Sequence, residues 1–154
     1  MNSMNDSGIV AGLASGQTSH THRLRGLAVT GFIAALAATV ATTLAAALAQ
    51  AVGVDFEVPD GGETIPLSGF AVVTGFFSLV GIVIAGALLR WSARPAELFV
   101  WTAVALNAIS FVAPLLSGAT AATTTALLGL HLVPATVMIP TLARSLRTRT
   151  GPSS

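Results

Sequence analysis

The charged residues of this chain are confined to a few short segments, with long uncharged intervals between them. All seven basic residues are arginines, and they occur in three clusters: Arg23 and Arg25, Arg90 and Arg94, and Arg144, Arg147 and Arg149. The intervals 26–54 and 64–89 contain no charged side chain, and within 98–143 the only ionisable group is His131. A soluble domain distributes charge over its whole surface, so this pattern indicates a membrane protein.

The low charge content limits what kind of protein this chain can be. Charged residues make up 8% of the chain, against about 25% in an ordinary globular protein, so a soluble domain would lack a solvated surface. The clustered arginines provide no basic face for nucleic acid. The chain has no cysteine, which excludes disulfides, thiolate metal sites and a lipoprotein anchor. Abundant alanine, and arginine without lysine, suggest a GC-rich bacterial genome, so we expect a multi-pass protein of the bacterial plasma membrane.

The uncharged intervals predict an all-α fold, an integral membrane four-helix bundle. A helix needs about 20 apolar residues to cross a hydrocarbon core about 30 Å thick. The first two intervals fit one span each, and the third is long enough for two, with a turn at Ser117 and Gly118 after Pro114. The predicted spans are about 27–52, 66–89, 97–116 and 124–143, within a transmembrane domain over 23–144.

The segments outside the spans are expected to be cytoplasmic tails. Residues 1–22 are polar and have no hydrophobic period, so we expect a disordered tail there. Residues 145–154 are expected to form a short basic tail.

The placement of arginine predicts the orientation of the bundle. Cytoplasmic loops carry an excess of basic residues, and the three arginine clusters all fall on the same side of a four-span chain. We therefore expect the N-terminus, the loop over 90–97 and the C-terminus in the cytoplasm. The acidic loop over 53–65 and the turn over 117–123 should lie outside.

A cleaved signal peptide is the alternative interpretation of the first span. Ala47-Leu48-Ala49 followed by Gln50 fits a cleavage site. However, the apolar stretch is longer than the h-region of a signal peptide, and a long polar segment precedes it.

Small residues predict where the helices pack. Lipid removes the hydrophobic drive between helices, so close contact between small residues gains weight. The first span has two neighbouring rows at steps of four: Gly31, Ala35, Thr39, Thr43 and Ala47, and Ala34, Ala38, Thr42 and Ala46. The second span has Gly75, Gly81 and Gly86. We expect both patterns at helix interfaces, although chance also produces such spacings in an alanine-rich chain.

Three prolines, Pro114, Pro134 and Pro140, interrupt otherwise helical runs. Each removes a hydrogen bond to the carbonyl four residues earlier. The result is either a set of kinked packing helices or a hinge or cavity lined by carbonyl groups.

A candidate intramembrane polar site consists of Asn107, Ser110 and His131, which lie at similar depth on the last two spans. Polar residues within a membrane are costly and are candidates for function. The site is either proton-sensitive or ligand-binding, or His131 is a neutral, hydrogen-bonded contact between helices. In each case we expect its ring to face the third span, within reach of Asn107, Ser110 or a carbonyl freed by proline.

A candidate outer acidic loop follows the first span and contains Asp55, Glu57, Asp60 and Glu63. Carboxylates beside glycine turns can hold a divalent cation. The spacing differs from that of an EF-hand and does not supply a full oxygen shell. A solvated negative loop that supports the orientation is therefore the simpler interpretation, and we predict no metal site.

The chain contains no nucleophile elbow, phosphate-binding glycine loop, zinc-protease motif or dinucleotide fingerprint. Paired histidines for haem are not available in the spans, since His20 and His22 lie in the N-terminal segment. We therefore predict no enzymatic activity, no catalytic residue and no cofactor.

Four short stretches carry a resemblance to a known family: 53–58 (GVDFEV), 121–125 (AATTT), 130–133 (LHLV) and Ile139-Pro140 before Leu142-Ala143-Arg144. Over about 24–144 the chain resembles a family of small four-helix actinobacterial membrane proteins catalogued as domain-of-unknown-function family 6069. The resemblance implies the same topology and supplies no activity.

These observations predict an integral plasma-membrane protein with a structural or accessory role in the cell envelope. Its expected partners are the lipid bilayer and either further copies of itself or another membrane protein, with no nucleic acid. The alternative is a small oligomeric transporter or channel with a polar site at Asn107 and His131. A third hypothesis is a membrane enzyme that uses His131.

Overall fold

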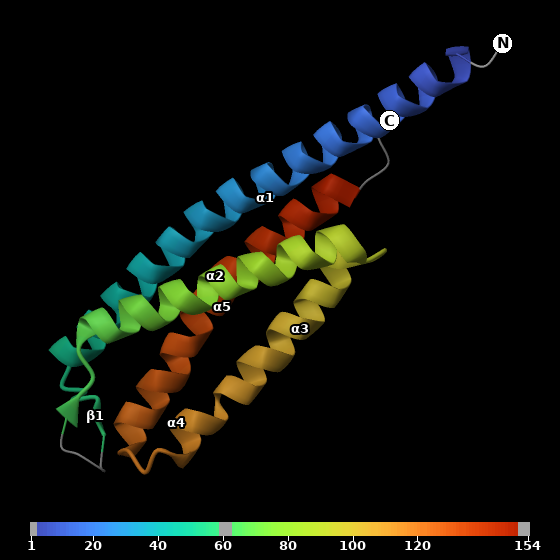
Figure 1. The fold of residues 1–154 in the computed structure, drawn as a ribbon. Coiled ribbons are helices and arrows are strands. Elements are labelled where there is room, and N and C mark those ends of the chain that lie inside the picture. Colours follow the sequence, from blue (N-terminus) through green and yellow to red (C-terminus); the bar gives the residue numbers. More distant parts are fainter. Residues whose placement is uncertain (1–2, 59–62, 151–154) are drawn as a thin grey trace.

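Long helices joined by short connections make up the chain (Figure 1). The computed structural model describes residues 3–58 and 63–150, and the side chains of 21–57 and 63–150. The elements are α1 (Ser3–Ala51), β1 (Glu57–Val58), β2 (Glu63–Thr64), α2 (Leu67–Trp91), α3 (Pro95–Ser110), α4 (Val112–Leu116) and α5 (Ala121–Thr150).

Four helical segments in this part of the chain are long and apolar enough to cross a membrane. They are Thr21–Ala51, Leu67–Trp91, Pro95–Leu116 and Ala121–Thr150. The predicted all-α membrane fold with four helices is therefore confirmed. Each observed segment contains most of a predicted span, because the cost of placing charge in hydrocarbon limits where a span can lie.

The four segments pack as an antiparallel bundle. α1 lies along both α2 and α5, α3 packs against α5 and α2, and α2 also contacts α5. The first turns of α1 project beyond the other helices (Figure 1). Between α1 and α2, β1 and β2 form a short antiparallel pair in which Glu57 lies opposite Thr64.

The small-residue face of α1 lies at the centre of the bundle. All four residues of one predicted row, Ala34, Ala38, Thr42 and Ala46, are buried. In the neighbouring row Gly31 and Ala35 are buried, whereas the remaining members are half-buried. The predicted interface on α1 is thus confirmed, and its centre is the 34–38–42–46 row.

The glycines of α2 do not follow the pattern of α1. We expected Gly81 and Gly86 at a helix interface, and this expectation is wrong. A Cβ atom added to Gly81 or Gly86 would meet no atom within 4 Å. The buried side of α2 consists of Thr74, Ser78, Ala85 and Leu89. In lipid both the inner and the outer faces of a helix are apolar, so glycine alone does not identify the packed face.

Proline interrupts the third span but not the fourth. α3 ends at Ser110 and α4 begins at Val112, because the ring of Pro114 clashes with the Ser110 carbonyl and cannot bond to it. α5 continues through Pro134 and Pro140. Figure 1 shows that α5 bends in its middle, so that its second half follows α1.

Both expected tails differ from the structure. α1 begins at Ser3, so the described part of the predicted disordered segment, 3–22, is helical. α5 continues to Thr150, so most of the predicted basic tail is also helical, with Ser145 and Leu146 buried. Extending a formed helix adds one hydrogen bond for each residue and costs far less than starting one.

Candidate functional site

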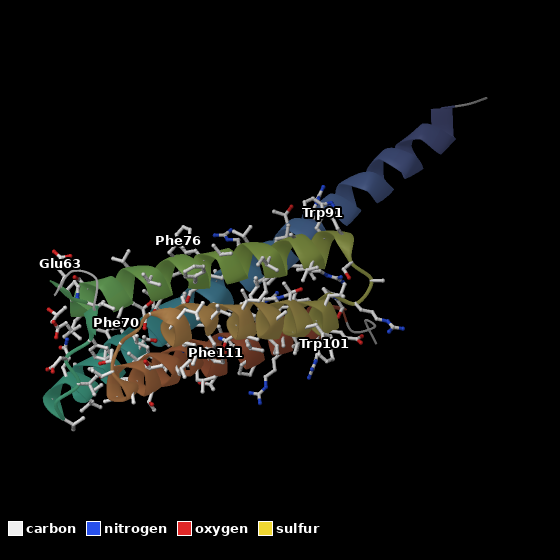
Figure 2. All side chains as sticks on the ribbon, turned by 90° about the horizontal axis from the view of Figure 1, so that it is seen from below. Glu63, Phe70, Phe76, Trp91, Trp101 and Phe111 are labelled. Atoms are coloured by element: carbon white, nitrogen blue, oxygen red, sulfur yellow. The ribbon has the colours of Figure 1, made fainter. Side chains whose placement is uncertain are left out.

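The bundle separates its charges between two ends. The start of the first membrane segment, the end of α2, the start of α3 and the end of α5 lie together, and this arginine end contains all three arginine clusters. At the opposite end lies the loop with Asp55, Glu57 and Glu63. Figure 2 shows Glu63 at one end and Trp91 and Trp101 at the other. The fold thus brings together arginines that are far apart in the sequence.

Asn107 links α3 to α5. Its side-chain Nδ2 donates a hydrogen bond to the backbone carbonyl of His131, with 3.4 Å between the heavy atoms. That carbonyl lies three residues before Pro134, in the turn that the proline loosens. The structure therefore brings two of the three predicted polar residues together, through the backbone of one of them.

Ser110 is satisfied within its own helix. Its hydroxyl donates to the carbonyl of Asn107 at 2.7 Å. A serine hydroxyl that bonds back to the preceding turn has no free donor for a partner on α5. Ser110 consequently lies near the predicted site without bridging the two helices.

The His131 ring faces the junction of α3 and α4. Nδ1 lies 2.8 Å from the carbonyl oxygen of Leu127, and since a carbonyl only accepts, this nitrogen carries a proton. The ring also contacts Phe111 edge to face, with 6.0 Å between the ring centroids. The ring therefore faces the third span, as predicted, through Phe111. Its hydrogen bond differs from the prediction: among the described residues the ring forms none with Asn107 or Ser110 and bonds within α5 instead.

A pocket of about 250 Å³ lies beside His131, at the end of the bundle that carries the acidic loop. Its walls include Phe56 and Ile65 from the loop, Pro114 and Ser117 near α4, and Thr123 and His131 from α5. The lining is mostly apolar and combines residues of the loop after α1 with residues of α4, the turn after it and α5. This arrangement could admit a small apolar molecule to the imidazole edge.

Phe56 was not among the predicted site residues. Its φ is +48°, a left-handed conformation that is uncommon for a residue other than glycine, and its side chain is fully buried. It packs on Phe70 with 5.0 Å between ring centroids and belongs to a cluster with Ala46 and Leu130. The sequence signal that could have identified Phe56 is its position between Asp55 and Glu57. A loop that is only solvated does not need an aromatic residue there.

The acidic loop is exposed. Asp55, Glu57 and Glu63 are all solvent-accessible, and Asp60 lies outside the described residues. Within the described part of the chain, no group of three or more histidine, cysteine, aspartate or glutamate residues is placed to hold a metal ion.

The fold and the charge distribution define an α-helical, multi-pass membrane protein. Comparison with protein-family models then gives the particular family: residues 22–148 match the model of a family of unknown function, DUF6069. The match covers most of the chain, which therefore belongs to this family, and the resemblance described above is confirmed. Comparison with curated proteins and with solved structures gives no match.

Proposed function

We propose that this protein is a structural or accessory component of the bacterial cell envelope, acting in the plasma membrane through a partner and not through its own chemistry. The observation that supports this most directly is that Asn107, Ser110 and His131 direct their side-chain hydrogen bonds to backbone carbonyls of the bundle itself. Asn107 bonds to the His131 backbone, Ser110 to the Asn107 backbone, and His131 to the Leu127 backbone. The Asn107 bond joins α3 to α5 and stabilises their contact, whereas the other two bonds lie within one helix.

The proposed orientation places the arginine end in the cytoplasm. The support is the positive-inside rule together with the segregation of arginines and acids between the two ends of the bundle. Reporter fusions after Arg90 and after Arg144 should behave as cytoplasmic, and a fusion after Thr64 as external. An external reporter after Arg144 would overturn the orientation.

Affinity purification of the tagged full-length chain from its native membranes tests the accessory role. A membrane protein should co-purify in a constant ratio to the chain. The control is a second four-span protein carrying the same tag at the same expression level. Recovery of the chain without any partner beyond those of the control would contradict the proposal.

Transport is the second candidate, and the pocket beside His131 is the observation that favours it. A transporter requires that an ion or small molecule cross the bilayer in the presence of the purified protein. Proton or cation flux into liposomes, lost in His131→Ala with unchanged helix content, would establish this function in place of the accessory role.

A further inference from the structure

A second pocket, of about 390 Å³, lies at the arginine end between the start of α3 and the end of α5. Its walls include Arg94, Pro95, Glu97 and Trp101 on one side and Arg147 and Thr150 on the other. Arg94 and Arg147 come from two different arginine clusters. The antiparallel arrangement of α3 and α5 places them around the same space.

The charges around this pocket favour an anion. Arg94 forms an ion pair with Glu97 at 3.6 Å, but both side chains are largely exposed, so the pair is weak and leaves Arg94 available. Among the residues whose side chains are described, Arg147 forms no ion pair. Within the same part of the chain, Glu97 is the only acid at an end that carries seven arginines. The local potential is therefore positive.

The donors around the pocket suit a phosphate group. Guanidinium groups present flat, forked donors that match phosphate oxygens, and here two of them come from separate elements. α3 starts at the pocket, and its N-cap residue Arg94 makes no side-chain capping bond. The first backbone N–H groups of a helix have no acceptor within it, so those of Ala96 and Glu97 add donors on the same side.

Apolar groups complete the pocket. Val100 and Trp101 follow one turn further along α3, and Trp101 is 67% exposed. Tryptophan is enriched at the level of lipid headgroups. A ligand in this pocket would contact arginines with its polar end and an apolar helix face with the end nearer the bilayer centre. A phospholipid has both a charged group and apolar chains, whereas a free anion has only the charge.

We infer that this pocket binds the headgroup phosphate of an anionic phospholipid of the phosphatidylglycerol type, in the leaflet that contains the arginine end. Arg94 and Arg147 hold the phosphate, and Trp101 contacts the first carbons of an acyl chain. Neither the family match nor the proposed accessory role requires this site.

Native mass spectrometry of the full chain in detergent, with phosphatidylglycerol or phosphatidylcholine of identical acyl chains added, tests the inference. The chain should bind one phosphatidylglycerol in preference to phosphatidylcholine. Arg94→Gln/Arg147→Gln should weaken phosphatidylglycerol binding by roughly 30-fold, from the loss of two interfacial arginines. The matched control is Arg23→Gln/Arg90→Gln, which removes the same charge from the same end outside the pocket. It should change the affinity much less, because neither of these arginines lines the pocket.

Three outcomes would overturn the inference: equal weakening in both double variants, no preference between the two lipids, or full competition by inorganic phosphate at millimolar concentration. The last result would assign the pocket to a free anion. Trp101→Ala provides a second test that leaves both arginines in place. It should weaken binding of the long-chain lipid and leave binding of glycerol phosphate unchanged, and an unchanged lipid affinity would contradict the assignment. Helix content by circular dichroism shows that each variant is folded.

Discussion

At the scale of single residues, His131 contributes to the bundle in two separate ways, through its backbone carbonyl and through its ring. Its backbone carbonyl accepts from Asn107, and its ring contacts Phe111 and the Leu127 carbonyl. Replacing the side chain by alanine removes the ring contacts and keeps the carbonyl. The two contacts should therefore be separable by mutation.

A pair of double-mutant cycles measures this separation. Asn107→Ala combined with His131→Ala should show almost no coupling in the free energy of unfolding, because Asn107 does not bond to the ring. Phe111→Ala combined with His131→Ala should show a coupling of roughly 0.5–1 kcal/mol, which is typical of a ring pair. Unfolding in mixed detergent and SDS micelles gives these energies. Strong coupling in the first cycle would show that the Asn107 side chain bonds to the imidazole.

Gly31 provides a second prediction at this scale. A Cβ atom there would lie 2.7 Å from Cγ1 of Ile82 and 3.3 Å from Cδ2 of Leu142. Gly31→Ala should therefore destabilise the bundle by about 1–3 kcal/mol through overpacking, although alanine is the better helix former. Gly81→Ala is the matched control, because a Cβ there meets nothing, and it should be neutral or stabilising. If Gly31→Ala is as stable as the control, α1 and α2 are not in close contact at this position.

At the scale of whole elements, the bend of α5 lets one helix serve two neighbours. α5 packs against both α3 and α1, and these two helices diverge along the bundle (Figure 1). The prolines that allow the bend, Pro134 and Pro140, are within the helix. A straight helix could follow only one of its two neighbours along its whole length.

Removal of both prolines tests this account of α5. Pro134→Ala/Pro140→Ala should straighten the helix and increase the distance between spin labels at residues 125 and 148, measured by electron paramagnetic resonance. The bundle should lose stability even though two helical hydrogen bonds are restored, since contact with α1 or α3 must be given up. An unchanged label distance would show that packing, and not proline, produces the bend.

Some elements and sites of this structure can be predicted from the sequence, and others cannot. The number of spans follows from the charge-free intervals, because charge in hydrocarbon is expensive wherever it occurs. Which face of α2 is packed does not follow, because both faces are apolar and Gly81 and Gly86 turn out to be open. The nearness of Asn107 and His131 follows from their shared depth. The bond through the His131 backbone does not, because Pro134 marks a loosened turn without showing which of its carbonyls meets Asn107.

At the scale of the whole molecule, α1 is a central part of the bundle. It packs against α2 and α5 and contributes Ala34, Ala38 and Ala46 to the buried core. Its removal at the possible cleavage site before Gln50 would expose the inner faces of two helices to lipid. We therefore expect the protein isolated from membranes to retain α1. Intact-mass measurement of the purified chain checks this expectation, and a mature chain that begins at Gln50 would contradict it.

The position of α5 after the other three spans has a consequence for biosynthesis. α5 contacts α1, α2 and α3, yet it leaves the ribosome after all three of them. Before it is inserted, α1 and α2 can pair, but Asn107 on α3 has no carbonyl to bond and faces hydrocarbon at a cost of several kcal/mol. A chain terminated before Ala121 is therefore not a smaller version of the same bundle. In such a chain the Asn107 side chain would lack the carbonyl that α5 supplies in the complete bundle.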